Sequence, residues 1–310
     1  MLVKREEIDE DKWNRFVESS PQGYIYHYTW YLDAVFEDWQ AVIIKNNEQW
    51  HAVMPLTVKK KWGVRYALQP IFTQFLGVLY RPQESKLEKQ LADKKDWTEA
   101  IIHEIPKLKV FHYNFSPNFD YPLPFYWQKY TLHTRYNYIL DLNTSIEHLH
   151  QNLNSGMRQT IKKGIENELT ISQESDINLI GSHVDKRFLN EKMYAVMKKL
   201  FEQAQKRNRA TLLVVKDKQG KVLTGGVFMQ YKNESWINLY GSFKPNEDTE
   251  KRPAGFMVWK AIELAHKNGF KVFDFEGSMI EGVERFFRKF GARPVPYISV
   301  YKNNLPFKIR

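Results

Sequence analysis

The hydrophobic positions in the first half of this chain recur at two spacings, which predict helices and strands in turn. Apolar residues three or four positions apart indicate amphipathic helices, whereas alternating or short continuous apolar runs indicate strands. Polar turns such as Asn46-Asn47, and Pro106, separate these elements. The elements expected here are helices over 9–19, 30–36 and 85–105, a hairpin over 40–59, and strands near residue 66, over 75–80 and over 109–115.

The second half shows the same kinds of pattern. Gly269 directly follows an apolar helical repeat, which is the position of a left-handed helix terminator. Asn143-Thr144-Ser145 is typical of a helix cap. The expected elements are a strand region over 127–142, two short helices after the cap, a strand over 169–173, a helical region over 176–207 that breaks between 187 and 190, a hairpin of 212–215 and 222–231, a strand over 236–241, a helix over 254–268, a strand over 271–275, a short helix over 281–290 and a last strand over 296–301.

Two segments of the first half are echoed in the second. Residues 109–116 (KVFHYNFS) match 271–278 (KVFDFEGS), and residues 41–46 match 212–217 in apolar character. The elements that follow come in the same order, which favours an internal duplication over a chance likeness of strands rich in Val, Phe and Tyr. We therefore expect a mixed α+β fold of two related domains, 1–134 and 135–310, each a mostly antiparallel sheet flanked by helices. A cleft between two related halves is a natural place for a ligand.

Composition narrows the chemistry. A length of 310 residues with 43% hydrophobic positions suits two domains of ordinary size. The absence of cysteine excludes disulfides and a thiolate nucleophile. A formal net charge of +10 suits an anionic partner such as a nucleotide, a coenzyme, RNA or a membrane surface, although an ordinary basic surface explains it equally. The chain begins without an apolar signal core and has no run of membrane-spanning length, so a soluble cytoplasmic protein without stable membrane insertion is expected.

The histidines and acidic residues show no metal-ligand spacing. His148 and His150 are two positions apart near a helix start, where their side chains diverge. No paired-histidine motif and no Asp-rich calcium loop occurs, so no metal is expected. No serine lies in a nucleophile-elbow context either.

A family resemblance is carried by the order of short motifs in the last ninety residues. These motifs are Thr224-Gly225-Gly226-Val227, Leu239-Tyr240-Gly241-Ser242, residues 256–262 (FMVWKAI), residues 268–277 (NGFKVFDFEG) and residues 284–292 (ERFFRKFGA). Together they resemble the C-terminal half of the FemA/FemB-like branch of the GNAT acyltransferase superfamily. Residues 154–163 resemble the basic helix that opens this half, and residues 19–30 resemble the beginning of the family's N-terminal half. The resemblance spans most of the chain and is weakest over 60–130.

This resemblance implies two tandem GNAT-like domains and transfer of an acyl or aminoacyl group to an amine. It implies either acyl-CoA or aminoacyl-tRNA as co-substrate, a small-molecule amine as acceptor, tRNA as a partner in the aminoacyl case, and neither DNA binding nor a tightly bound cofactor. Two features depart from the peptidoglycan-bridge enzymes of the family. Residues 176–207 lack the sustained heptads of their coiled-coil arm, and Phe287 stands where they tend to have lysine.

The candidate catalytic residues are Glu276, Asp274 and Tyr240. Asp274 and Glu276 are two positions apart on an expected strand, so both are expected on one face, where they could deprotonate or hold an amine. Burial among aromatic residues would raise a carboxyl pKa toward the working range. Tyr240, at the end of the preceding strand, could protonate the leaving group. The alternatives are a strand end that reaches solvent, for the carboxylates, and packing, for the tyrosine.

The candidate donor-binding residues lie before and within the expected helix 254–268 and in the preceding hairpin. Arg252 and Gly255 retain part of the GNAT pyrophosphate loop, and Lys251 adds charge near the free N–H groups of a helix start. Gly225-Gly226 within a strand could let a donor lie along the backbone, or could allow close helix packing.

Two basic groups are candidate substrate-binding residues. Arg158, Lys162 and Lys163 recur at helical spacing, and Arg288 and Lys289 follow the aromatic pair Phe286-Phe287. A solvated helix face is the alternative interpretation of the first group.

Three functions remain open from sequence. The leading hypothesis is an N-acyltransferase that acts by direct attack of an amine on a thioester or ester. The second is an aminoacyl-tRNA-dependent transferase of the peptidoglycan-bridge type, and the third is a binding protein that kept the fold and lost the chemistry. The oligomeric state, the acyl group and the acceptor are not encoded in any motif we recognise.

Overall fold

The computed structural model describes residues 1–183, 189–241 and 252–305, which form two compact units. Unit 1 comprises Met1–Arg135 and Pro296–Arg310, and unit 2 comprises Tyr136–Val295. The expected boundary at 134/135 therefore differs by one residue from the division observed, but the expected second domain also held the C-terminal segment. That segment belongs to unit 1 because its strand pairs with a strand of unit 1, from Ser299↔Asn114 to Asn303↔Val110.

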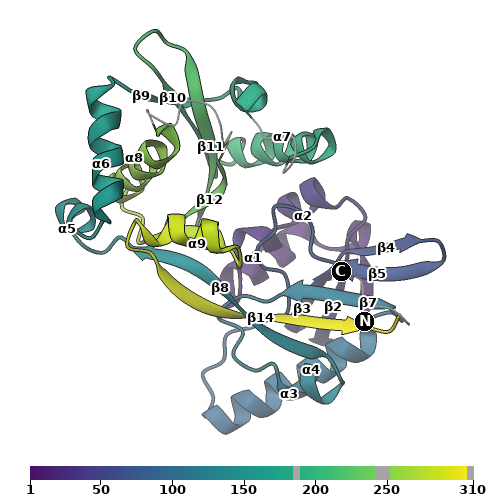
Figure 1. The fold of residues 1–310 in the computed structure, drawn as a ribbon. Coiled ribbons are helices and arrows are strands. Elements are labelled where there is room, and N and C mark those ends of the chain that lie inside the picture. The colour runs from purple at the N-terminus through teal and green to yellow at the C-terminus, as the bar shows by residue number, and fades with distance from the viewer. Residues whose placement is uncertain (184–188, 242–251, 306–310) are drawn as a thin grey trace. The chain divides into compact units, whose positions relative to one another are not determined.

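Unit 1 is rich in buried aromatic side chains. Its smaller sheet has the strand order β1-β2-β3-β6. Its other strands pair in the order β4-β5-β7-β14, in which β5 and β7 are parallel and the other two pairs are antiparallel. Strand β14 (Arg293–Asn303) belongs to this unit from Pro296 onward. Trp13, Trp39, Tyr26 and Tyr31 are fully enclosed in its core. The elements are β1 (Leu2–Lys4), η1 (Arg5–Glu7), α1 (Glu10–Ser19), η2 (Ile25–His27), α2 (Thr29–Val35), β2 (Gln40–Asn46), β3 (Gln49–Leu56), β4 (Val58–Lys61), β5 (Val64–Leu68), β6 (Leu79–Tyr80), α3 (Leu87–Glu104), β7 (Val110–Asn114) and α4 (Leu123–Trp127) (Figure 1).

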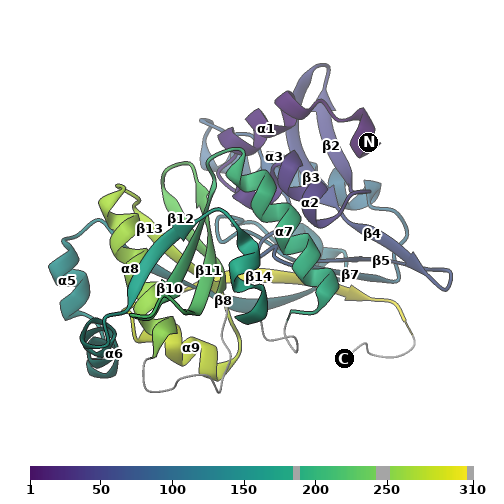
Figure 2. The ribbon, with the colours of Figure 1, turned by 90° about the horizontal axis from the view of Figure 1, so that it is seen from above.

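Unit 2 is a sheet covered by helices on both faces. Its strand order is β8-β13-β12-β11-β10-β9, and the neighbours β12 and β13 are parallel. Figure 2 shows α7 on the opposite side of this sheet from α6 and α8. The elements are β8 (Thr131–Asp141, in this unit from Tyr136), α5 (Ile146–Gln151), α6 (Ser155–Glu166), β9 (Thr170–Glu174), η3 (Ile177–His183), α7 (Glu191–Gln205), β10 (Ala210–Lys216), β11 (Val222–Tyr231), β12 (Ser235–Gly241), α8 (Pro253–Lys267), β13 (Val272–Gly277) and α9 (Glu281–Arg288).

The echoed strands β7 and β13 have equivalent neighbours within their own units. Strand β7 is parallel to β5 and antiparallel to β14, and β13 is parallel to β12 and antiparallel to β8. Each is preceded along the chain by a long helix, α3 or α8, and earlier by a hairpin. The order of hairpin, long helix and echoed strand is thus common to both units, as the duplication inferred from the sequence predicts.

Local signals explain most element boundaries. The Ser145 hydroxyl accepts a hydrogen bond from His148 N at 3.2 Å, which confirms the cap expected at the start of α5. Gly269 ends α8 with φ +78°, as its position predicts. The expected helical region over 176–207 consists of η3 and α7, with residues 184–188 outside the described part.

Two expected strands are shorter than the apolar pattern suggests. The strand expected over 75–80 is reduced to β6, and the strand region expected over 127–142 begins only at Thr131. Pro122 and Pro124 start the short helix α4 instead, because proline is pre-organised for the first helical turn. Among the described residues, no helix is both long enough and apolar enough to cross a membrane.

Candidate functional site

The candidate site lies in unit 2, where the parallel strands β12 and β13 diverge. Their ladder runs from Ser235↔Val272 to Ile237↔Asp274, although β12 continues to Gly241 and β13 to Gly277. Beyond this last pair, no pairing between the described residues of β12 and β13 continues. Asp274 occupies the last rung before the separation.

Each of these strands carries a bulge just past the last rung. In β12 the pairs Val227↔Tyr240 and Phe228↔Asn238 leave Leu239 as an extra residue. In β13 the pair with Ile139 of β8 is followed by a pair between Gly277 and Asn137, which adds one residue to β13. Bulges concentrate next to active sites because they redirect side chains and end pairing.

The bulge in β12 brings Tyr240 to the face of the sheet that carries Asp274. Phe228 contacts Phe273 and Trp236 within the core on the α8 side, so Val227, its neighbour, faces the other way. Tyr240 pairs with Val227 and therefore shares that second face, to which Asp274 also belongs because it alternates with Phe273. Without Leu239 as an extra residue, Tyr240 would face α8.

The side chain of Asp274 is buried, although its carboxyl group can carry a charge. Its Oδ1 accepts hydrogen bonds from Asn137 Nδ2 at 2.9 Å and from the backbone N of Glu276 at 2.8 Å. Burial raises the pKa of Asp274 to about 6, against the opposing effect of these two hydrogen bonds. Its Oδ2 has no hydrogen-bond partner within the described part of the chain. A carboxyl with this pKa can exchange a proton near neutral pH.

Glu276 lies in the bulge of β13 rather than on a regular strand. Its φ of +60° is in the left-handed region, which is unusual for a residue other than glycine, asparagine or aspartate. The expectation that Asp274 and Glu276 share a face depended on regular alternation, which the bulge interrupts. Gly277, not Glu276, takes the position opposite Asn137. A strained conformation at this point is consistent with a functional constraint.

Two asparagines that sequence reasoning missed carry buried polar atoms near the end of the β12–β13 ladder. Asn137 contacts Asp274, whereas Asn238 pairs with Phe228 and therefore belongs to the α8 face. Asn137 is fully enclosed and Asn238 is nearly so, and the Oδ1 of each has no hydrogen-bond partner among the described residues. Buried carbonyl oxygens without a partner are rare and call for an explanation, such as a ligand or a water molecule. The only sequence signal was asparagine inside an expected strand, where this residue is disfavoured.

The candidate donor-binding glycines are needed for packing. A Cβ on Gly225 would lie 2.2 Å from Ile180 Cγ2, and one on Gly226 would lie 2.9 Å from Met257 Cε. Gly255 faces α6, where a Cβ would lie 2.9 Å from Thr160 Cγ2. The space beside each glycine is thus filled by the protein's own side chains, which accounts for these residues without a ligand. Their assignment to donor binding remains a prediction.

The charged residues expected to bind the donor lie at the start of α8. Arg252 is the N-cap residue, has φ +44°, and makes no side-chain capping hydrogen bond. Pro253 begins the helix, one residue before the start expected at 254, because proline suits the first helical position. Lys251 lies outside the described residues. A role for these residues in donor binding remains a prediction.

The first basic group, on α6, makes contacts within the protein. The Arg158 guanidinium donates to the backbone oxygens of Gln151 and Leu153 near the end of α5, and Lys162 pairs with Glu166 at 3.6 Å. Lys163 is half-buried in the last turn of the helix. Substrate binding by this group is untested, and these contacts are those of an exposed helix face.

The second basic group lies at the end of α9. Arg288 pairs with Glu284 at 3.2 Å, and Lys289 is the residue that ends the helix. Phe287, at the position where peptidoglycan-bridge enzymes tend to have lysine, is buried against Phe275 at 5.1 Å between ring centroids. The short helix therefore directs an aromatic ring, not a charge, into the core of unit 2.

No group of three or more His, Asp or Glu side chains among the described residues is arranged to hold a metal ion. The arrangement around Asp274 suits proton transfer, because it combines a buried carboxyl group with hydrogen-bonding side chains and backbone where the β12–β13 pairing ends.

Similarity to solved structures identifies the fold. FemX superposes with a TM-score of 0.66 over 94% of this chain and 96% of that chain, at 13% identity. L-PGS from Bacillus licheniformis gives 0.59 over 96% and 93% at 13% identity, and a tandem GNAT protein from the clavulanic acid biosynthesis pathway gives 0.60 over 99% of both chains at 7% identity. No protein-family model and no curated protein matches the sequence. These likenesses show a fold of two tandem GNAT-like domains, which is the fold that the sequence motifs indicated.

Proposed function

We propose that this chain is an N-acyltransferase that moves an acyl or aminoacyl group from a thioester or ester donor to an amine. The observation that carries the proposal is the buried Asp274 at the divergence of β12 and β13, with its pKa raised to about 6. The solved structures that resemble this chain in fold are transferases of the GNAT type. This similarity supports the class of reaction, but it does not identify the substrates.

In this proposal Asp274 is the general base. The amine nitrogen attacks the carbonyl carbon of the donor and a new C–N bond forms. The nitrogen loses its proton to Oδ2 of Asp274, while Oδ1 stays bonded to Asn137 and to the backbone of Glu276. A base with a pKa near 6 is deprotonated at neutral pH and still accepts a proton from the attacking amine.

Collapse of the tetrahedral intermediate breaks the carbon–sulfur or carbon–oxygen bond, and the leaving group takes a proton. Tyr240 is the candidate acid, because strand alternation and the Leu239 bulge assign it to the Asp274 face. Asn137 supports the carboxylate, and Glu276 is the candidate to hold the acceptor amine. No covalent enzyme intermediate is needed, in keeping with a chain that has no cysteine.

We infer acyl-CoA as the first donor to test and aminoacyl-tRNA as the second. Both are anionic and suit a chain with a formal net charge of +10. Lys251, Arg252, Gly255, Gly225 and Gly226 are the candidate donor-binding residues. Arg158, Lys162, Lys163, Arg288 and Lys289 are the candidate residues for binding phosphates of the substrates.

The absence of cysteine makes a direct assay possible. A thiol reagent detects only the coenzyme A that is released, because the protein contributes no thiol background. We expect release from one or more acyl-CoAs in the presence of an amine panel, with the acylated amine identified by mass spectrometry. Charged tRNA would be tested in parallel by following the loss of its amino acid.

Two variants of unit 2 test the role of Asp274. Asp274→Asn should abolish turnover, and Asp141→Asn should leave it unchanged. The control is matched, because Asp141 Oδ1 also accepts from a backbone N and an asparagine Nδ2, both of Asn143, but lies at the surface. Transfer by Asp274→Asn at the wild-type rate would refute the assignment of the base. A folded protein without transfer from either donor class would refute the proposed function and favour a binding protein.

A further inference from the structure

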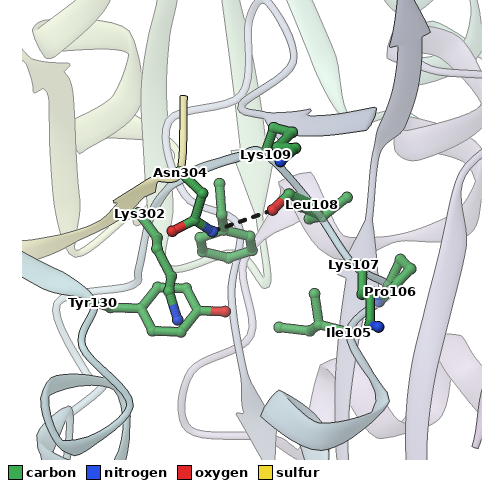
Figure 3. A pocket seen from close by; sticks show the side chains of 9 residues that line it. Ile105, Pro106, Lys107, Leu108, Lys109, Tyr130, Lys302 and Asn304 are labelled. Atoms are coloured by element: carbon green, nitrogen blue, oxygen red, sulfur yellow. Dashed lines mark hydrogen bonds between the residues drawn. The ribbon is translucent and has the colours of Figure 1, made fainter. Parts of the chain in front are cut away.

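Unit 1 contains a cavity of about 410 Å³ beyond the C-terminal end of α3, where the chain enters β7. Ile105, Phe111 and the ring of Tyr130 give it apolar walls (Figure 3). Its volume lies within the range of small-molecule sites. All its lining residues belong to unit 1, whereas the candidate acyl-transfer site belongs to unit 2.

The hydroxyl group of a buried tyrosine points into this cavity. Tyr130 is 8% exposed, and its ring is fixed edge-on to Phe111 at 5.5 Å and to Phe125 at 5.3 Å. Figure 3 shows the hydroxyl directed toward the centre of the space, and it has no hydrogen-bond partner among the residues that the structure describes. Burial raises the pKa of Tyr130 to about 12, so the phenol stays neutral and can donate its proton.

The charges around the cavity are all positive. Lys107, Lys109 and Lys302 line it, and no carboxylate does. Within the described part of the chain, none of the three lysines forms an ion pair. Lys302 lies over the Tyr130 ring, with Nζ 4.6 Å from the ring centroid, and Nζ donates to Gln128 O at 2.9 Å. An ammonium group has three donors, so this contact leaves capacity for a ligand.

We propose that this cavity binds a small organic phosphate with an apolar or aromatic body. The phosphate oxygens accept hydrogen bonds from the Tyr130 hydroxyl and from Lys302, and Lys107 and Lys109 add positive potential. The body rests against Ile105 and Phe111. A dianionic group suits several lysines without a compensating acid, and the apolar walls discriminate an organic phosphate from the inorganic ion.

Phenyl phosphate is a suitable probe, with phenol and inorganic phosphate as its two halves. Calorimetric titration of the full chain should show binding of phenyl phosphate at least tenfold tighter than of either half. Tyr130→Phe removes only the hydroxyl and should weaken binding about tenfold, the size of one hydrogen bond to a charged group. Lys302→Met keeps the apolar stem and should weaken it by a similar factor.

Lys232→Met is the matched control. Lys232 Nζ also lies over a tyrosine ring, that of Tyr231 at 5.1 Å, but in unit 2, and its loss changes the net charge equally. This variant should bind phenyl phosphate within twofold of the wild type. Circular dichroism establishes that each variant is folded. No binding by the wild type, equal affinity for inorganic phosphate, or unchanged affinity in folded Tyr130→Phe and Lys302→Met would each overturn the proposal.

Discussion

Replacing Asp274 by asparagine should stabilise unit 2 at neutral pH. The folded protein keeps this carboxyl at a pKa of about 6, against a usual value of 3.8, because the group is buried. Between these values the folded state holds a proton that the unfolded state has lost. The contribution of this group to stability is therefore complete below pH 3.8 and is lost as the pH rises through about 6.

The size of the effect follows from the two pKa values. A rise from 3.8 to about 6 corresponds to about 3 kcal/mol, since one pKa unit is worth about 1.4 kcal/mol. Asparagine preserves an Oδ1 acceptor for Asn137 and for the Glu276 backbone, without a charge to bury. Asp274→Asn should thus exceed the wild type by up to about 3 kcal/mol at pH 7, and this gain should vanish below pH 4.

The difference in stability between Asp274→Asn and the wild type can be measured by hydrogen exchange of the amides of β8 and β13. Exchange is monitored by mass spectrometry at pH values from 4 to 8, and it reports the stability of these strands separately from that of unit 1. Asp141→Asn should have the opposite effect. The backbone N and side chain of Asn143 lower the pKa of Asp141, so its contribution is present at neutral pH and is lost on acidification. A difference between Asp274→Asn and the wild type that does not change with pH would refute the reasoning.

Three further outcomes follow from the structure. The kcat/KM of acyl transfer should rise with pH with a midpoint near 6, the pKa of Asp274, and a profile without this midpoint would contradict its role as the base. Gly225→Ala should destabilise unit 2 by about 1 to 3 kcal/mol in urea unfolding, because the new Cβ would lie 2.2 Å from Ile180 Cγ2, and Ile180→Ala in the same chain should recover part of the loss. His27 is buried, and burial lowers its pKa to about 4. The free energy of unfolding of unit 1 should therefore fall by up to about 3 kcal/mol as the pH is lowered from 6.5 to 4. Hydrogen exchange of α1 and α2 should show this pH dependence in the wild type and not in His27→Asn.

The sequence predicts those features that local signals determine. The β2–β3 hairpin turns at Asn46-Asn47, and α8 begins at Pro253 and ends before Gly269, because each of these residues favours one backbone conformation. The echo between residues 109–116 and 271–278 likewise identifies two strands with equivalent neighbours, since strands at equivalent positions need similar side chains.

The features that sequence could not predict depend on partners far along the chain. Asn137 and Asp274 are 137 positions apart, and nothing near either residue indicates their hydrogen bond. The bulges at Leu239 and before Gly277 exist only relative to the neighbouring strands, so the letters Asp-Phe-Glu-Gly read as regular alternation. The return of β14 to unit 1 depends on its pairing with β7, which no local pattern encodes.

Asp274 lies on the last β12–β13 rung, where its carboxyl group is buried and its pKa is raised by this burial. One rung earlier, a carboxyl would be covered by the continuing ladder, where no substrate could reach it. Two residues later, at Glu276, the side chain is only partly buried. At the last rung, a side chain is buried and also lies where the β12–β13 pairing ends. An Asp274→Asn and Asn137→Asp double variant moves the carboxyl group to position 137 and keeps it on the same face of the sheet. We expect acyl transfer by this variant to be impaired. Full activity would show that the position of the carboxyl group on the last β12–β13 rung is not required for transfer.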